Sequence, residues 1–322
     1  MIHEKIKIQM PGSCDYAALY TYVLDYYDKL GVEKRPIVIV CPGGGYDHTS
    51  DREGEALALM FNSIGIHAAV LRYSTGPSTF PTDLSELAFA VKFLREKAQE
   101  WHIDKDKILI QGSSAGGHLI ASLGCFWNKA FLPSEVKKGF GKILGGNGRG
   151  MMNMDGSDDY AAVFNPDEIR YSKVSNEDIR PNGLILNYPV ITSGEYAHAG
   201  SIKNLIGDLE NADDFSDEKG ISMSDFVSLE KRVSKDVPAC FIWHTFEDQA
   251  VPVENSILFA AALRKAGVST ELHIFPHGCH GLGLGTALTA ANEGKEVVPE
   301  VNMWTSLVKN WIEINYPITT KF

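Results

Sequence analysis

Short apolar runs alternate with longer segments of helical periodicity along most of the chain. The runs are bounded by turn-forming residues, which is typical of strands buried on both faces of a sheet. They lie at residues 37–40, 68–71, 108–110, 184–186, 240–243 and 272–275. Apolar side chains recur at helical spacing in residues 53–64, 82–100, 117–127, 253–266 and 301–314. This alternation predicts an α/β protein with a mainly parallel central sheet and helices on both faces.

Two parts of the chain depart from the alternation. Residues 4–10 and 17–26 predict an antiparallel pair of strands before the parallel part. Residues 128–180 and 191–235 follow neither pattern, so we expect insertions or cap segments above the carboxyl ends of the strands, within a single domain of residues 1–322. Long segments of this kind are often lids or substrate-binding loops, although a surface loop explains residues 128–180 equally well.

Composition narrows the class of partner. Acidic residues outnumber basic ones by 41 to 30, the formal net charge is -11, and no basic stripe is present. Nucleic acid and anionic membranes are therefore poor partners. No segment approaches the roughly 18 apolar residues of a membrane span, and the first residues lack a signal-peptide core. We expect a cytoplasmic protein with reduced cysteines, and the oligomeric state stays open, a homo-oligomer included.

The segment Gln111–His118 carries the clearest chemical motif. It reads QGSSAGGH and contains Gly-x-Ser-x-Gly directly after a predicted strand and before a predicted helix. A serine on a sharp strand-to-helix turn needs small neighbours, and Gly112, Ala115 and Gly116 meet this need. The pattern alone is common, so the strand before it and the helix after it carry the prediction that Ser114 is a nucleophile.

Asp248 and His280 are the candidate acid and base. A serine hydroxyl needs a base to take its proton, and a carboxylate must orient that base. Both residues follow predicted strands, and the chain order Ser114, Asp248, His280 is the order expected for one hydrolase architecture. Glu247 is the competing acid and His277 the competing base, and either acid could instead be a solvated loop residue or a helix cap.

The loop after the last strand also invites a metal-site interpretation. His273, His277 and His280 have a spacing that could suggest zinc. A zinc site needs a further ligand and convergent side chains, and strand geometry directs His273 elsewhere. We therefore predict no metal and no cofactor.

The glycine-rich segment after the strand at residues 37–40 is the candidate oxyanion loop. Acyl transfer needs donors for the negative charge that develops on the carbonyl oxygen, and glycines let backbone N–H groups approach a substrate. We predict the amides of Gly44 and Gly45 as donors, joined by that of Ala115. The segment lacks the Lys-Ser/Thr ending of a P-loop and the Gly-x-Gly-x-x-Gly spacing, so nucleotide binding is the weaker alternative.

With these pieces assembled, the chain resembles the α/β-hydrolase esterases, specifically the acetyl esterase and acetylxylan-esterase-like branch related to hormone-sensitive lipase. The segments that carry the resemblance are residues 42–46, 71–73, 101–104, 112–119, 186–190, 243–245 with 248, 251–256, and 277–278 with 280–281. Pro42 stands where much of the wider family has a histidine, which leaves the glycine donors intact. Residues 128–180 match no family segment, so the substrate pocket is not defined by the resemblance.

The resemblance implies a serine esterase that deacylates small esters, with acetylated sugars or xylo-oligosaccharides as substrates. Tyr46 and Tyr188 lie near predicted strand ends and are candidates for sugar contacts, although core packing also explains each of them. A peptidase or amidase of the same fold is one alternative, and a non-catalytic binding module is another. Peptidases of this fold usually follow a propeller-like repeat domain, and we expect none before this domain. Binding modules of this fold usually lack the serine, the acid or the histidine, and candidates for all three are present in this sequence.

Replacing Ser114 with alanine is expected to abolish hydrolysis of p-nitrophenyl acetate without unfolding the protein. The variant keeps the loop backbone but loses the attacking oxygen. Steady-state kinetics measures the loss, and circular dichroism of both proteins is the folding control. Wild-type rates in the variant would remove Ser114 from the mechanism.

Overall fold

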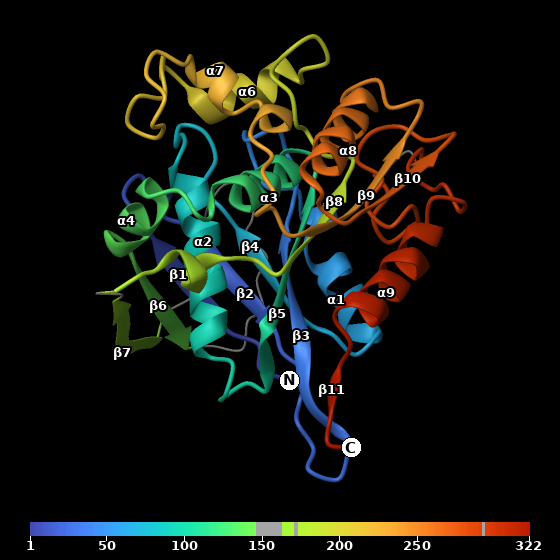
Figure 1. Cartoon of the computed structure of the whole chain (residues 1–322). Coiled ribbons are helices and arrows are strands. Elements are labelled where there is room, and N and C mark those ends of the chain that lie inside the picture. The colour runs from blue at the N-terminus through green and yellow to red at the C-terminus, as the bar shows by residue number, and fades with distance from the viewer. Residues whose placement is uncertain (146–162, 171–172, 292–293) are drawn as a thin grey trace.

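The fold is built on a single twisted sheet (Figure 1). The computed structural model describes residues 1–145, 163–170, 173–291 and 294–322. Its strands are β1 (Lys5–Gln9), β2 (Ala18–Tyr22), β3 (Val32–Cys41), β4 (His67–Arg72), β5 (Ile103–Ser113), β6 (Phe140–Gly145), β7 (Val163–Arg170), β8 (Gly183–Asn187), β9 (Ala239–Thr245), β10 (Thr270–Phe275) and β11 (Thr319–Thr320). Their order across the sheet is β10-β9-β8-β5-β3-β4-β2-β1-β6-β7, and β11 pairs with β3.

The parallel part of the sheet consists of the strands that the apolar runs predict. β3 pairs in parallel with β4 and β5, β5 with β8, β8 with β9, and β9 with β10. All their carboxyl ends therefore lie at one edge of the sheet, where loops and helix starts gather. The predicted antiparallel pair is also present, because β1 and β2 pair with each other and β2 continues the sheet beside β4.

Helices cover both faces of this sheet. They are α1 (Glu55–Ser63), α2 (Thr82–Glu96), α3 (Ala115–Phe126), α4 (Phe131–Lys137), α5 (Asn176–Ile179), α6 (Ala199–Ile206), α7 (Met223–Phe226), α8 (Glu254–Ala266) and α9 (Met303–Asn315), with 3-10 turns η1 (Asp51–Glu53) and η2 (Leu229–Lys231). Within the described residues, none of these helices combines the length and the apolar character that crossing a membrane requires.

Alternate side chains of each central strand enter two separate cores. In β3, Ile37, Ile39 and Cys41 pack in one core with α2, α3 and α8, whereas Val38 and Val40 pack in the other with α1 and α9. A strand that is buried on both faces has no polar side, which is why its sequence reads as a continuous apolar run. The expected α/β architecture is confirmed.

The two irregular segments take different places. In the described part of residues 128–180, β6 pairs antiparallel with β1, and β7 pairs with β6. The described residues of this segment therefore extend the sheet beyond β1, because β6 pairs with the edge of β1. They do not form a cap above the carboxyl ends of the parallel strands, which corrects that expectation. Residues 146–162, with the glycine- and methionine-rich stretch noted in the sequence, lie outside the described residues.

The segment 191–235 lies above the carboxyl ends of the parallel strands and carries α6 and α7 (Figure 1). The Asn204 side-chain amide donates a hydrogen bond to the Gly45 carbonyl at 2.9 Å, which joins α6 to the loop after β3. This segment is therefore positioned to border a site at the strand ends.

Candidate active site

Ser114 occupies the sharp turn between β5 and α3. Its φ of 55° and ψ of −118° are strained for a residue with a side chain, so the surrounding structure must hold it. The Ser114 amide donates to the Asn187 carbonyl at 3.0 Å, and the Val190 amide donates to the Ser114 carbonyl at 3.0 Å. The end of β8 and the loop after it therefore fix the backbone of the turn.

The flanking glycines of this turn have no room for a side chain. A Cβ at Gly112 would lie 2.1 Å from the Gly116 carbonyl oxygen, and a Cβ at Gly116 would lie 2.1 Å from the Cys41 carbonyl oxygen. Contacts this short with backbone atoms cannot be relieved by a side-chain rotation. The Gly-x-Ser-x-Gly spacing thus follows from close packing of β5, α3 and β3.

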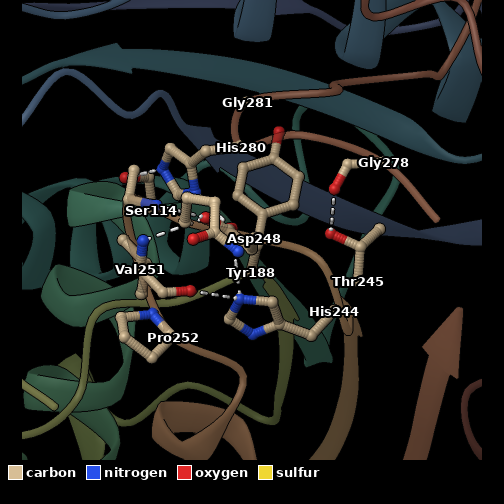
Figure 2. A network of polar contacts seen from close by, with 12 residues as sticks. Ser114, Tyr188, His244, Thr245, Asp248, Val251, Pro252, Gly278, His280 and Gly281 are labelled. Atoms are coloured by element: carbon tan, nitrogen blue, oxygen red, sulfur yellow. Dashed lines mark hydrogen bonds and ion pairs between the residues drawn. The ribbon is translucent and has the colours of Figure 1, made fainter. Parts of the chain in front are cut away.

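Ser114, His280 and Asp248 form a continuous hydrogen-bonded chain (Figure 2). His280 Nε2 lies 2.7 Å from Ser114 Oγ, and His280 Nδ1 lies 2.6 Å from Asp248 Oδ2. With Nδ1–H donating to the carboxylate, Nε2 is left as the acceptor for the serine hydroxyl. Side chains from three separate loops thus meet at the carboxyl edge of the sheet.

Asp248 is held as an anion by its surroundings. Its Oδ1 accepts from the amides of Ala250 and Val251 at 2.9 Å each, and His244 Nε2 lies 3.3 Å from its Oδ2. Burial alone would raise the pKa of this carboxyl, but the hydrogen bonds with His244 and His280, and the charge of His280, hold the pKa well below its ordinary value.

The competing residues lie in other contacts. Glu247 and His277 pair with each other, with 2.9 Å between Oε1 and Nδ1, and both are exposed. His273 Nε2 instead lies 2.7 Å from Glu271 Oε1. The three loop histidines therefore have separate partners, and no group of three or more His, Cys, Asp and Glu side chains suited to a metal occurs among the described residues.

The loop after β3 lies directly against the serine turn. Gly44 has φ of 128° and Gly45 has φ of 64°, conformations that glycine adopts without strain. The Gly43 amide donates to Glu53 Oε2 at 2.8 Å, whereas no hydrogen bond within the described residues uses the amide of Gly44, Gly45 or Ala115. These three amides are therefore available as donors, and their function stays a prediction.

Tyr46 and Tyr188 are placed differently from what the sequence suggested. Their exposed fractions are 2% and 1%. The Tyr46 hydroxyl lies 2.9 Å from His118 Nδ1, and the Tyr188 hydroxyl donates to Glu53 Oε1 at 2.6 Å. Neither ring offers a face on which a sugar could stack, which corrects the prediction that they contact substrate.

Residues 24–263 match the BD-FAE family. The chain belongs to this family. It is 34% identical over 274 residues to endo-1,4-beta-xylanase B of Butyrivibrio fibrisolvens, covering 83% of this chain and 36% of that protein. It is 29% identical over 256 residues to an acetylxylan esterase of Xylanibacter ruminicola, covering 77% of this chain and 41% of that protein. This BD-FAE chain thus spans well under half of the length of these two relatives.

Solved structures place this BD-FAE chain in the α/β-hydrolase fold. An acetyl ester-xyloside bifunctional hydrolase from Caldicellulosiruptor lactoaceticus superimposes with a TM-score of 0.69 at 33% identity, covering 94% of this chain and 89% of that one. The carboxylesterase Cest-2923 from Lactobacillus plantarum, at 22% identity and a TM-score of 0.73 over 100% of both chains, shares the fold. The expected fold and family are confirmed.

Three residues around the site of this BD-FAE protein were missed by the sequence reasoning. Arg52 donates to the Gly281 carbonyl at 2.5 Å, directly after His280, and Glu53 accepts from the Gly43 amide in the loop after β3. His198 lies in the cap segment beside Gly45, and burial first, then the nearby charge of His280, lowers its pKa. Only their nearness to the glycine-rich loop could have drawn attention to Arg52 and Glu53, and nothing in the sequence marked His198.

Replacing Gly112 with alanine is expected to lower the free energy of unfolding by about 3 kcal/mol, because the new methyl group overlaps the backbone of Gly116. Urea denaturation measures the change. Gly200→Ala is the matched control, since a Cβ there would make an ordinary 3.6 Å contact with His198, and its effect should stay within about 1 kcal/mol. Equal losses in the two variants would contradict the packing argument.

The lowered pKa of Asp248 makes its contribution to stability depend on pH. Because the folded state favours the ionised form, the contribution is fully present above the ordinary carboxyl pKa of about 4 and is lost as the pH falls through the lower folded-state value. We expect the difference in unfolding free energy between wild type and Asp248→Asn to be largest near neutral pH and to narrow below about pH 4. Urea denaturation across this pH range measures the difference in unfolding free energy. A difference that widens toward acidic pH would contradict the prediction.

Proposed function

We propose that this chain is a serine carboxylesterase that cleaves small esters through an acyl-enzyme. The observation that carries the proposal is the unbroken contact from Asp248 to His280 to Ser114, at 2.6 and 2.7 Å. A hydroxyl, an imidazole and a buried carboxylate in this order form an activated nucleophile.

In the first half of the proposed reaction, Ser114 Oγ attacks the ester carbonyl carbon while His280 Nε2 takes its proton. The tetrahedral intermediate then collapses, the carbon–alkoxy bond breaks, and His280 returns the proton to the leaving alcohol. In the second half, His280 takes a proton from water as the water oxygen attacks the acyl carbon. The acid leaves, and the proton goes back to Ser114.

Asp248 supports each proton transfer by stabilising the imidazolium that forms twice in the cycle. Its burial supports this function, because a charge in a weakly polar surrounding acts on its neighbour more strongly than in water. The amides of Gly44, Gly45 and Ala115, which have no hydrogen-bond partner in the described part of the chain, are the proposed donors to the oxyanion. Ala115 also begins α3, so the positive end of that helix dipole favours the same negative charge.

The proposed substrates are acetyl esters of sugars or xylo-oligosaccharides. The support comes from relatives named as an acetylxylan esterase, at 29% identity, and an acetyl ester-xyloside bifunctional hydrolase, at 33% identity. In this chain Asn204 of α6 donates to the Gly45 carbonyl, so the segment 191–235 borders the proposed oxyanion loop.

The proposal is tested by a panel of p-nitrophenyl esters from acetyl to octanoyl, together with acetylated xylo-oligosaccharides and dipeptide amides. We expect kcat/KM to be highest for acetyl and to fall at least about tenfold by octanoyl, since each methylene that does not fit changes binding by about 1–3 kcal/mol. Acetate should be released from the oligosaccharides.

A fluorophosphonate probe should label the wild type and leave Ser114→Ala unlabelled, which provides the matched control for the panel. Faster cleavage of the amides than of the esters would replace the esterase by a peptidase. An unlabelled wild type would instead favour a binding module.

A further inference from the structure

η1 places a buried carboxylate between two loops of the site. Glu53 has an exposed fraction of 4%, and both its oxygens accept hydrogen bonds. Oε2 accepts from the Gly43 amide at 2.8 Å, and Oε1 accepts from the Tyr188 hydroxyl at 2.6 Å. A buried carboxylate is costly unless it is hydrogen-bonded, so the two donors and the carboxylate hold one another in place.

At its first end, Glu53 sets the position of the oxyanion loop. A Cβ at Gly43 would lie 2.7 Å from Glu53 Oε2 and 2.9 Å from Ser114 Cβ, so the loop backbone lies tightly between the carboxylate and the nucleophile. The amides of Gly44 and Gly45 follow directly in the chain. Because Glu53 takes the Gly43 amide, it fixes the peptide that immediately precedes the two peptides carrying these N–H groups.

At its second end, Glu53 reaches the loop that carries the base. The Tyr188 hydroxyl donates to Glu53 and accepts from the Gly283 amide at 2.9 Å, three residues after His280. The Tyr188 ring stands edge-on to the His280 ring, with centroids 5.2 Å apart (Figure 2). Gly283 is held from its other side by Trp304, whose indole N–H donates to the Gly283 carbonyl at 3.0 Å.

Arg52 makes a second connection between the same turn and the base loop. Its guanidinium donates to the Gly281 carbonyl at 2.5 Å and to the Thr289 carbonyl at 2.7 Å. Arg52 therefore contacts the segment after His280 directly, and Glu53 contacts it through Tyr188. Of these two residues of η1, only Glu53 also contacts the oxyanion loop.

We propose that Glu53 is a positioning residue that fixes the oxyanion donors and the base relative to each other through Tyr188. This inference rests on the proposed esterase function and extends it. Glu53 transfers no proton in the reaction, and its hydrogen-bond partners are Gly43 and Tyr188 rather than Ser114 or His280. Its effect is geometric, because oxyanion donors act only within a narrow range of distance and direction.

The position requires two acceptors on one side chain of this length. Glutamine would offer one acceptor oxygen and one NH2 group, so it could accept from only one of the two donors, and its NH2 group could meet the Tyr188 hydroxyl only with that hydroxyl as acceptor. Aspartate is one methylene shorter and would reach only one partner. Glu53→Gln therefore removes the charge and one acceptor with the smallest change in volume, and Tyr188→Phe removes the connection itself by deleting a single oxygen.

The experiment compares kcat and KM for p-nitrophenyl acetate in wild type, Glu53→Gln, Tyr188→Phe and the double variant. We expect each single variant to lower kcat about 100-fold with KM changed less than about threefold, since misplacement by about 1 Å acts on the transition state. The double variant should be about as slow as either single one, because both changes break the same connection.

Glu55→Gln is the matched control, the same substitution two residues away on α1, and it should keep wild-type kcat. Wild-type kcat in Glu53→Gln, or single losses that multiply in the double variant, would overturn the inference. If Glu53→Gln does not fold by circular dichroism, Tyr188→Phe decides in its place, and wild-type kcat there overturns the inference. An inactive wild type would contradict the proposed function and this inference together. An active wild type whose kcat is equalled by Glu53→Gln and by Tyr188→Phe would contradict the inference alone.

Discussion

The close approach of backbones at the turn between β5 and α3 is the constraint on which the rest of the site depends. Ser114 can hold its strained conformation because Gly112 and Gly116 bring β5, α3 and the end of β3 into direct backbone contact. The same contact brings the glycine-rich loop against the serine, since that loop is the continuation of β3. The end of β8 and the residues after it hold the turn as well, because the Ser114 amide donates to the Asn187 carbonyl and the Val190 amide donates to the Ser114 carbonyl.

Charge within the site is organised around buried carboxylates with different partners. Asp248 accepts from two backbone amides and contacts two imidazoles, which keeps it ionised beside His280. Glu53 accepts from one amide and one phenol, and it connects two loops of the site through Gly43 and Tyr188. The first contact tunes the chemistry that we propose, and the second sets the geometry in which that chemistry would take place.

Local patterns predicted the parts of this protein that depend on local physics. Strands buried on both faces must be apolar, and a strained serine turn must have glycine neighbours, so the sheet, the helices and the turn at Ser114 could be identified in advance. Asp248 and His280 were found because each follows a strand in the expected chain order, and the structure brings both to Ser114. Tyr46 and Tyr188 were misjudged, because an aromatic residue near a strand end looks the same in sequence whether it faces solvent or the core.

The alternation of strands and helices, the turn that carries Ser114 and the chain order of Ser114, Asp248 and His280 could be derived from the sequence, because each of these rests on spacing within a few residues or on the rules of parallel sheets. The pairing of β6 with β1 and the contacts of Glu53 with residues 43 and 188 became visible only in the folded protein. Such contacts join segments far apart in the chain through single hydrogen bonds or open strand edges, so they leave no period or motif in the sequence.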